Sequence, residues 1–510
     1  MELSRLENFL QSKRTPWVVV GLTILLFAIA NLPWHLDDHD QAKQAFTSFE
    51  MIKEGHWFYQ RTPQEYVATK PPLVGWISAG LFSLTRSWDM AWRLPSLLAA
   101  IAISVLLFRT ASLAYGTIAS LIALSAFGLN LLSLRLATLV RTDMPLAFVI
   151  FLIGLLIWRK IQKEEAWSAS DQFSIFALLT AAMLIKGPIV YAFLLPGVAL
   201  FQWRTWGGHS RARPELVLSE AEGGAPPQNR YSASFGWWPW VASLGIFLLW
   251  AIGGILFQPG FFDQVVMREF IGRFGETIHR PQPLYFYVAH LLHKFAPWSV
   301  LMIALAVADL HSRKWQLRSV FRDMSPETFW LLCWSMGGLI VMSLIPSKRI
   351  DRILPVIPPL CLLLAAQIRN IFGNEQLRTR VCRWSAVALL WSIVVTGGYT
   401  ILKVVSGYRD HRDALVLFGR AVRHEAEAHH WRYEVVSAKD EGLLLYLQKT
   451  HFIRPNRAIV NWNRGNLDAL VAPTEDTPAL MRDLHDAALS QLKSTERREG
   501  QGRSYVLITR

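Results

Sequence analysis

Long apolar runs separated by short polar loops constrain this 510-residue chain more than any other feature. Hydrophobic residues make up 52% of the chain and its mean hydropathy is +0.26. Soluble domains rarely reach these values, whereas proteins that cross a membrane many times do so naturally. The sequence therefore predicts a mostly α, polytopic membrane protein with about eleven transmembrane helices. The apolar runs begin at Trp17, Leu94, Thr117, Met144, Phe173, Ile189, Trp237, Phe286, Thr328, Ile353 and Ser385.

The formal net charge of +14 is explained better by membrane topology than by binding to nucleic acid. The basic residues gather in short loops between apolar runs, as the positive-inside rule requires of cytoplasmic loops. We expect no nucleic-acid partner, and we expect a multi-pass bacterial inner-membrane protein. The loops predicted to be cytoplasmic are the start of the chain around Arg5, Lys13 and Arg14, then Arg159–Lys163, Arg204–Arg230, His311–Arg322 and Arg369–Arg383.

The segment Pro71–Thr85 determines the orientation of everything after it. It is apolar but has only 15 residues and opens with Pro-Pro, whereas a perpendicular transmembrane helix needs about 20 residues. We predict that it lies in the membrane interface rather than crossing. Asp143, the acidic residues around Asp40 and the C-terminal region then share the exported side. The first apolar run lacks a small-residue cleavage site, so we expect it to be a retained anchor.

Two domains are predicted, a transmembrane domain over residues 1–404 and a C-terminal periplasmic domain over 405–510. The second domain mixes strand-like and helix-like patterns, which favours a small α/β fold. The strands are expected at Tyr433–Val436, Ala458–Trp462 and Tyr505–Thr509, and the helices at Gly442–Gln448 and Pro478–Leu492.

Two other features are expected to carry no chemistry. Gly207–Ser234 is rich in Gly, Pro, Ser and charge, which indicates a flexible cytoplasmic insertion. The three cysteines, Cys333, Cys361 and Cys382, lie in or beside predicted spans. We therefore expect neither a disulfide nor a cysteine metal site.

A dense acidic cluster, His35–Asp40, follows the first apolar run. Carboxylates beside a bilayer are costly to desolvate and usually mark a functional site, and Asp40 is our candidate base. Two alternatives stay open. Asp40 caps a helix that starts near Gln41, a role that Asp37 or Asp38 would fill as well. Alternatively, His35, Asp37, Asp38, His39 and Asp40 bind a divalent metal, although adjacent residues chelate poorly.

The cluster begins an ordered series of short motifs. The series starts with Asp40-Gln41-Ala42-Lys43, Glu50-Met51, Gly55-His56-Trp57 and Lys70-Pro71-Pro72, and continues with Arg93-Leu94-Pro95-Ser96, Arg141-Thr142-Asp143-Met144-Pro145, Lys186-Gly187-Pro188 and Ser347-Lys348. Each motif is weak by itself, but their order resembles the GT-C glycosyltransferase superfamily of protein O-mannosyltransferases and lipid A aminoarabinose transferases. The resemblance covers about the first 370 residues.

This resemblance implies an integral-membrane glycosyltransferase. Such an enzyme moves a sugar from a polyprenyl-phosphate donor, such as undecaprenyl phosphate, to a lipid A, glycan or protein acceptor in the envelope, with inversion. The chain departs from the family pattern at two positions, because Gln41 and Thr69 stand where the family has acidic residues. In the aminoarabinose transferases the second of these helps to hold a metal ion. We therefore assign no metal site, and whether a divalent metal is needed stays open.

A phosphate leaving group needs no general acid, so one carboxylate that takes the acceptor proton is enough, together with cations for the phosphate. We expect Asp40 to be this base, with Asp38 close by. Asp143 begins a predicted span, where it is either a helix cap or a residue that orients the acceptor or a catalytic cation beside Asp40.

Cations at predicted outer span ends are candidates for the donor phosphate: Lys70, Lys186, Arg273 and Lys348. Each one alone is equally well explained by snorkelling to the interface. The loop Glu269–Tyr287 resembles the mobile exported loop of the family and is expected to cover the donor. Its candidate substrate contacts are His279, Arg280 and Tyr285, with Lys43 from the acidic cluster's helix.

Two other functions compete with sugar transfer. A transporter or flippase of lipid-linked sugars would place charges near the bilayer midplane, in broken helices, and would show internal repeats. The sequence has no repeat, but His290, His293 and Lys294 fall within one predicted span. A scaffold protein of the envelope would depend on the exported domain alone, and the ordered motifs argue against it.

Overall fold

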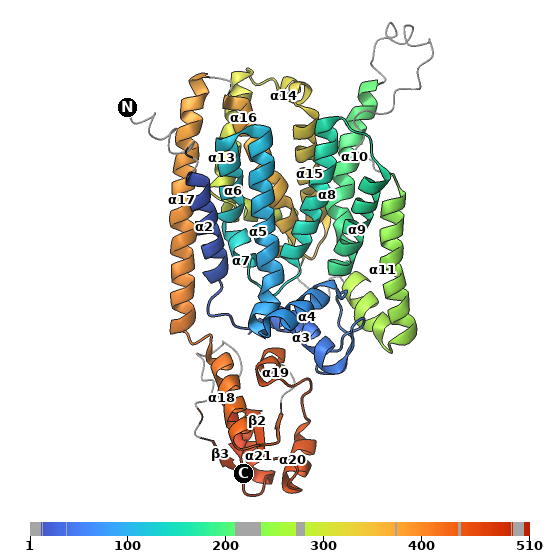
Figure 1. Cartoon of the computed structure of the whole chain (residues 1–510), viewed down its shortest axis with the longest axis vertical. Coiled ribbons are helices and arrows are strands. Elements are labelled where there is room, and N and C mark those ends of the chain that lie inside the picture. The colour runs from blue at the N-terminus through green and yellow to red at the C-terminus, as the bar shows by residue number, and fades with distance from the viewer. Residues whose placement is uncertain are drawn as a thin grey trace.

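The computed structural model describes residues 12, 14–36, 38–209, 236–271, 281–372, 375–436, 440–490, 492 and 504–510. A long bundle of helices forms the larger part, and a small part with mixed helices and strands lies at one end of it (Figure 1). The predicted mostly α fold is confirmed.

Seven described helices are long and apolar enough to cross a membrane. They are α5 (Trp88–Tyr115), α8 (Asp143–Lys163), α9 (Ala169–Lys186), α11 (Trp238–Phe257), α15 (Pro326–Leu344), η3 (Ile350–Val356) continued by α16 (Ile357–Phe372), and α17 (Glu375–Arg409). An eighth candidate is the pair α12 (Phe286–Lys294) and α13 (Trp298–Ser312), which bends by 101° at the break. The chain is a multi-pass membrane protein.

Three shorter apolar helices complete the bundle: α2 (Thr15–Ile29), α6 (Thr117–Gly128) and α10 (Ile189–His209). Each of the eleven predicted apolar runs therefore begins inside a helix or directly before one. Helices α10 and α15 approach closely, because a Cβ atom added to Gly337 would lie 2.6 Å from the backbone nitrogen of Gly197. Glycines that allow two backbones to touch are typical of helix packing in membranes.

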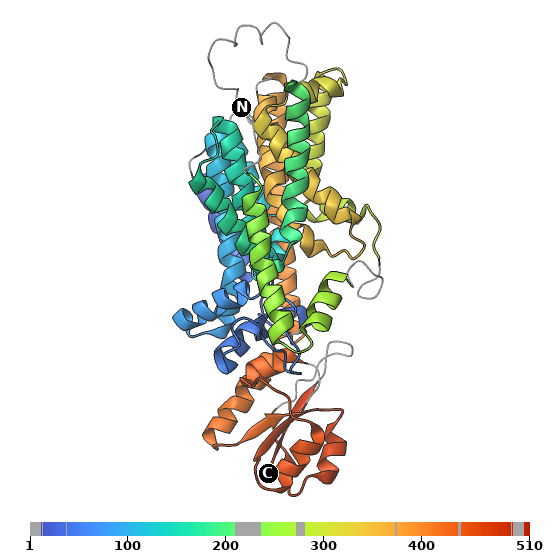
Figure 2. The ribbon, with the colours of Figure 1, turned by 90° about the vertical axis from the view of Figure 1, so that its right-hand side faces the viewer.

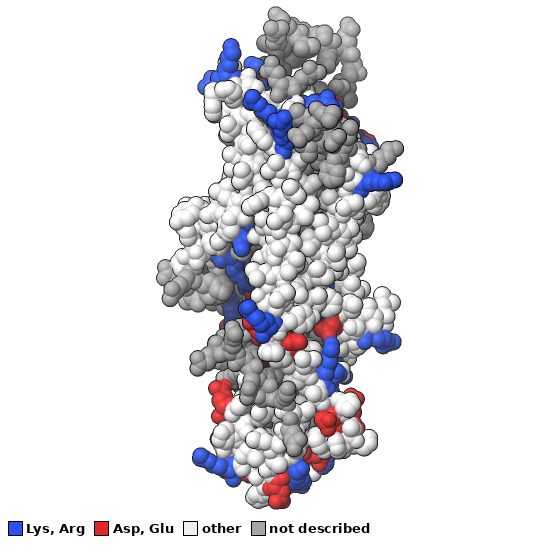
Figure 3. Space-filling model, turned by 90° about the vertical axis from the view of Figure 1, so that its left-hand side faces the viewer, with Lys and Arg blue, Asp and Glu red and all other residues white. Residues whose placement is uncertain are grey.

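One end of the bundle carries two helices that lie across its axis, α3 (His39–Glu54) and α4 (Leu73–Thr85) (Figures 1 and 2). Helix α4 corresponds to the segment predicted to lie in the membrane interface. Helix α14 (Leu317–Asp323), from one of the predicted cytoplasmic loops, lies at the opposite end (Figure 1). Much of the side of the bundle in Figure 3 is free of charged side chains, apart from basic side chains in a hollow at about mid-height on the left; the others gather toward the two ends and on the C-terminal part.

The C-terminal part has a four-stranded sheet in the order β1-β2-β4-β3. Strand β1 pairs parallel with β2, and the other two pairings are antiparallel. The elements are α18 (Ala414–Ala428), β1 (Tyr433–Val435), α19 (Glu441–Leu447), α20 (Pro455–Asn463), β2 (Ala469–Pro473), α21 (Thr477–Asp483), β3 (Ala488–Leu489) and β4 (Tyr505–Thr509).

The small α/β character is confirmed, but two of its elements were predicted wrongly. Ala458–Trp462 is part of helix α20 and not a strand: Pro455 starts the helix, and Ala458 and Trp462, four residues apart, are its buried residues. The helix predicted over Pro478–Leu492 ends at Asp483, and strand β3 follows it. The predicted boundary after residue 404 stays a prediction.

The C-terminal part packs directly against helix α3. Phe46 and Phe49 of α3 belong to the same buried cluster as Leu443 and Tyr446 of α19. Two polar contacts join the same surfaces, from His39 Nδ1 to Glu441 Oε2 at 3.1 Å and from Thr450 Oγ1 to Glu54 Oε1 at 2.6 Å. The C-terminal part therefore braces the helix that begins in the acidic cluster.

We predict that the α3 end of the bundle and the C-terminal part face the same side of the membrane. Single cysteines replacing exposed Gln64 and Asn456 should both react with a membrane-impermeant maleimide added to spheroplasts. Arg318→Cys, on α14 at the other end, should react only after permeabilisation, and the wild type is the control because its three cysteines are buried. Labelling of Asn456→Cys and Arg318→Cys from the same side would contradict this topology.

Candidate active site

Asp38, and not Asp40, caps helix α3. The helix begins at His39, and the Asp38 carboxylate accepts a hydrogen bond from the Asp40 backbone nitrogen at 3.0 Å. The alternative role of Asp40 as a helix cap is therefore wrong, because the preceding aspartate fills it. Asp37 lies outside the described residues. The Asp40 carboxylate is left available for contacts across the bundle.

Two arginines from distant segments bind the carboxylates. Arg349 Nη1 lies 2.5 Å from Asp40 Oδ2. Arg141 donates from Nη2 to Asp38 Oδ2 and from Nη1 to Asp351 Oδ2, each at 2.6 Å. Weaker contacts close the set, from Arg141 to Asp40 at 3.6 Å and from Arg349 to Asp351 at 3.5 Å. We call these five residues the carboxylate–arginine cluster.

Three segments supply the cluster. Asp38 and Asp40 stand at the start of α3, Arg141 lies two residues before α8, and Arg349 and Asp351 lie where the chain enters η3. Arg141 and Asp351 are almost fully buried, with side-chain exposures of 8% and 5%. Buried charges of this kind must be paired, so the pairing fixes how the three segments meet.

The cluster keeps Asp40 ionised. Burial opposes its negative charge, but the hydrogen bond and charge of Arg349, with the charges of Arg141 and Lys70, outweigh burial and lower the pKa of Asp40 to about 2. The Asp40 side chain is 39% exposed. A charged carboxylate is thus open to solvent on one side and held by a guanidinium on the other.

Asp143 forms a separate buried pair with Lys186. It is the first residue of α8, and the Lys186 Nζ at the end of α9 lies 2.5 Å from its Oδ1. The cap position before α8 belongs to Thr142, so the alternative role of Asp143 as the cap is wrong. Lys70 interacts electrostatically with both Asp40 and Asp143. The structure therefore brings Asp143, Lys70 and Lys186 to the same end of the bundle as the carboxylate–arginine cluster.

The remaining predicted site residues make other contacts or lie outside the described part of the chain. Lys348 is buried, its Nζ donates to the Gln282 carbonyl at 2.8 Å, and burial lowers the pKa of Lys348. Lys43 interacts electrostatically with Glu441 in the C-terminal part. Tyr285 stands before α12 and is 69% exposed. Arg273, His279 and Arg280 lie outside the described residues.

Arg349 and Asp351 were missed from the sequence, and Arg141 was noted only as part of a motif. One signal was present: Lys348-Arg349-Ile350-Asp351-Arg352 places four charged residues in five between two apolar helices. Charges so close to a membrane span are expensive and point to a shared function.

The described residues do not fit a divalent metal at the acidic cluster. Among them, no group of three or more His, Cys, Asp or Glu side chains has suitable positions. Asp38 and Asp40 already bind arginines, His39 binds Glu441, and Thr69 offers no carboxylate. We derive no step through a metal.

Comparison with known sequences supports the motif series. The family described as "Dolichyl-phosphate-mannose-protein mannosyltransferase" matches residues 69–211. An undecaprenyl phosphate-α-4-amino-4-deoxy-L-arabinose arabinosyl transferase of Shewanella sediminis is 24% identical over 375 residues, which cover 72% of this chain and 62% of the relative. A protein of the same name from Sodalis glossinidius is 32% identical over 152 residues, covering 29% of this chain and 25% of the relative. The chain thus spans less than two thirds of these relatives.

Two solved structures share the fold. ArnT from Cupriavidus metallidurans, bound to undecaprenyl phosphate, superposes with a TM-score of 0.67 at 17% identity, and the match covers 97% of this chain and 98% of that one. The archaeal oligosaccharyltransferase AglB from Archaeoglobus fulgidus, in complex with an inhibitory peptide and a dolichol-phosphate, gives a TM-score of 0.51 at 12% identity, covering 91% and 70%.

We predict that Arg141→Met destabilises the protein by about 3 kcal/mol, because it leaves buried Asp351 without its closest partner. The matched variant Arg349→Met should cost clearly less, since Arg349 and Asp40 are 33% and 39% exposed. Denaturant unfolding of the purified protein in detergent, followed by tryptophan fluorescence, measures both. Equal losses would contradict the structural role given to Arg141, and the double variant Arg141→Met/Asp351→Asn should regain part of the lost stability.

Proposed function

We propose that this chain, which has the GT-C fold and resembles the aminoarabinose transferases of that superfamily, is a membrane glycosyltransferase that uses a polyprenyl-phosphate sugar. The observation that carries the proposal is the pairing of Asp40 with Arg349 at one end of the bundle. A carboxylate that accepts a proton and a guanidinium that binds phosphate are the two groups that this transfer needs.

The reaction follows from these groups. The acceptor hydroxyl attacks the anomeric carbon of the sugar, and its proton passes to an Asp40 oxygen. The bond from that carbon to the phosphate oxygen breaks, and the electron pair leaves with the polyprenyl phosphate, which gains one negative charge. Attack from the face opposite the leaving group inverts the anomeric carbon. Cations that bind the growing charge lower the barrier more than they stabilise the bound donor.

Arg349 connects donor binding with the strength of the base. While it holds Asp40, the pKa of Asp40 is about 2, which makes the carboxylate a weak base. A donor phosphate competes for the same guanidinium, since bidentate phosphate binding is a strong preference of arginine. When Arg349 turns toward the phosphate, Asp40 loses its closest cation and becomes more basic. The base is thus activated only when the donor is in place.

Other cations would complete the phosphate site. Lys70 already interacts with the Asp40 carboxylate, so we propose it as the second phosphate ligand. Lys186 is bonded to Asp143 and would contribute only if Asp143 releases it, so its main role here is to hold Asp143 for the acceptor. Lys348, Arg273 and the contacts proposed for Lys43, His279, Arg280 and Tyr285 would act around the bound sugar.

We place this site on the outer face of the inner membrane. The acidic end of the bundle lies opposite the described basic loops (Figure 1), which the positive-inside rule assigns to the cytoplasm. The donor would keep its chain in the bilayer and its phosphate at that surface. The acceptor is an envelope lipid, glycan or protein.

Transport is the weaker alternative. The broken pair α12 and α13 has the discontinuity that transporters use. However, the described ion pairs between distant helices gather at one end of the bundle, and His293 bonds within its own helix to the Ala289 carbonyl at 3.0 Å.

We predict that Asp40→Asn abolishes sugar transfer, because an amide cannot accept the acceptor's proton. The matched control is Asp38→Asn, which removes a neighbouring carboxylate but keeps a good helix cap, and it should retain measurable turnover. The assay follows transfer from a radiolabelled polyprenyl-phosphate sugar to envelope extract by the purified protein. Wild-type turnover in folded Asp40→Asn would show that Asp40 is not the base. If Asp38→Asn lost more activity than Asp40→Asn, Asp38 would be the base instead.

We predict that Arg349→Gln creates an acid limb in the pH profile of kcat/KM for the donor. The lowered pKa of Asp40 keeps it ionised down to about pH 2 in the wild type, so its protonation does not limit the rate between pH 5 and 8. Removing Arg349 takes away a hydrogen bond and a charge that lower the pKa of Asp40, while burial still raises it, so the pKa of Asp40 rises and activity should fall toward the acid end of this range. The control is Arg322→Gln, an exposed cation far from Asp40. A flat profile in Arg349→Gln would contradict the coupling.

A further inference from the structure

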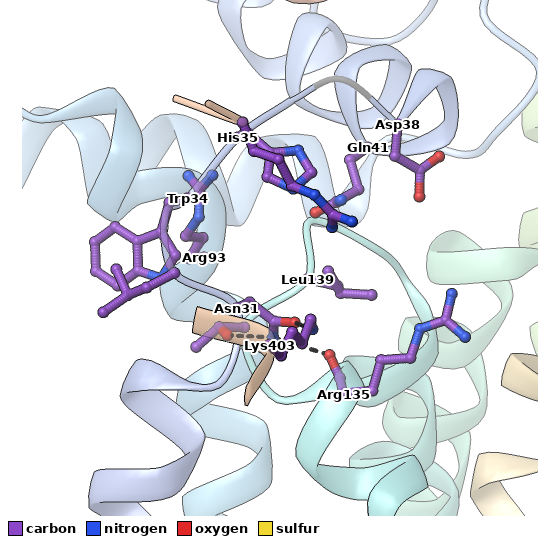
Figure 4. A pocket seen from close by; sticks show the side chains of 12 residues that line it. Asn31, Trp34, His35, Asp38, Gln41, Arg93, Arg135, Leu139 and Lys403 are labelled. Atoms are coloured by element: carbon purple, nitrogen blue, oxygen red, sulfur yellow. Dashed lines mark hydrogen bonds between the residues drawn. The ribbon is translucent and has the colours of Figure 1, made fainter. Parts of the chain in front are cut away.

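A charged cavity lies beside the start of α3 and shares Asp38 with the carboxylate–arginine cluster, while most of its lining comes from elements outside that cluster. Its volume is about 180 Å³. It is lined by the segment after α2, the start of α3, α5, the short helix α7 (Leu131–Leu136) and the residues after it, α17, and the linker after α17. Figure 4 shows the side chains of Arg93, Arg135 and Lys403 around it, with Asp38 at the side toward α3.

The lining carries more positive than negative charge. Arg93, Arg135, Lys403 and Arg412 face one carboxylate, Asp38. That carboxylate is already held by Arg141 at 2.6 Å, and Arg93 is paired with Asp89 at 3.3 Å. Within the described part of the chain, no carboxylate forms an ion pair with any of the other three cations.

The fold holds these three cations close together. Arg135 and Arg412 both act electrostatically on Lys403, and all three are only partly exposed. Lys403 Nζ donates to Asn31 Oδ1 at 2.5 Å, while Asn31 Nδ2 donates to Thr138 Oγ1 at 2.7 Å and to the Arg135 carbonyl at 2.9 Å. Asn31 thus fixes the ammonium at the cavity wall. Like charges that are gathered and partly desolvated are unfavourable unless an anion joins them.

The volume of the cavity and its position along the bundle restrict which kind of anion can bind. Pockets for whole small molecules usually have about 300–1,000 Å³, so this cavity fits one charged headgroup and not a complete sugar–lipid. The cavity lies beside the C-terminal end of α17. This helix is a candidate span, and Ile401, Leu402 and Val405 are exposed on its surface there. Arginine and lysine side chains bind phosphate groups, and cations at the end of a transmembrane helix lie at the depth of the lipid headgroups.

We propose that the cavity binds the phosphate headgroup of an anionic phospholipid of the surrounding membrane. The headgroup phosphate lies among Arg135, Lys403 and Arg412, and the acyl chains lie along the outer surface of α17. The three cations lie outside the carboxylate–arginine cluster, and the cavity shares only Asp38 with it. A bound lipid would therefore hold the end of α2 and α7, the C-terminal linker and the start of α3 together.

The test is lipid retention by the full-length protein, measured by native mass spectrometry after titration with phosphatidylglycerol. The double variant Arg135→Gln/Arg412→Gln should weaken retention by about a hundredfold, because each charge-assisted contact contributes roughly tenfold. The matched control is Arg409→Gln, three residues from Arg412 on an exposed side chain paired with Asp410, and it should bind as the wild type does. Arg135→Lys/Arg412→Lys keeps the charges and should retain most of the binding.

Several outcomes would overturn the proposal. Equal retention by the wild type and the folded Gln double variant would do so, and so would equal binding of zwitterionic phosphatidylcholine. If inorganic phosphate binds as tightly as the lipid, the cavity is a site for free phosphate and the lipid assignment fails. The variant Arg349→Gln separates this site from the donor site. Phosphatidylglycerol retention should be unchanged in Arg349→Gln. Loss of retention in this variant would mean that the lipid had occupied the site proposed for undecaprenyl phosphate.

Discussion

The rest of this end of the molecule depends on the two ion pairs that Arg141 forms, one with Asp351 and one with Asp38. One buried guanidinium joins the start of α3, the entry to α8 and the entry to η3. Removing either side would leave a charge without a partner in a poorly solvated place, which is far more costly than the pair is favourable. The fold therefore tolerates one arrangement of the three segments, and that arrangement sets Asp40 against Arg349.

The charged side chains around Arg141 differ in how deeply they are buried, and so in how easily they can exchange one partner for another. Arg141 is closed in by two carboxylates and serves structure. Arg349 and Asp40 are each about one-third exposed, so solvent reaches this pair. This gradient from buried to exposed is what would allow one cluster both to hold the fold and to supply the base and the phosphate ligand of the proposed function. The C-terminal part contributes by packing on α3, which keeps the Asp40 helix from moving away.

The sequence by itself determined the class of fold and pointed to the segment that carries the candidate site. The apolar runs and the acidic cluster after the first run follow from local composition, because the cost of burying charge in a bilayer acts on each segment separately. The ordered motifs pointed to the GT-C superfamily and to Asp40 and Asp143. Local pattern was weaker in the C-terminal part, where Ala458–Trp462 resembles a strand because it is short, apolar and β-branched, but Pro455 and the four-residue spacing make it a helix.

Only the tertiary structure decided which charges meet. Asp40 and Arg349 are 309 residues apart, and Arg141 and Asp351 are 210 apart, so no local spacing reveals that they pair. The roles of Asp38 as the helix cap and of Lys186 as the partner of Asp143 likewise depend on distances between helices. The cavity of Arg135, Lys403 and Arg412 exists only where α7, α17 and the linker come together. Pairing of buried charges is a property of packed segments, whereas periodicity and hydropathy are properties of each segment alone.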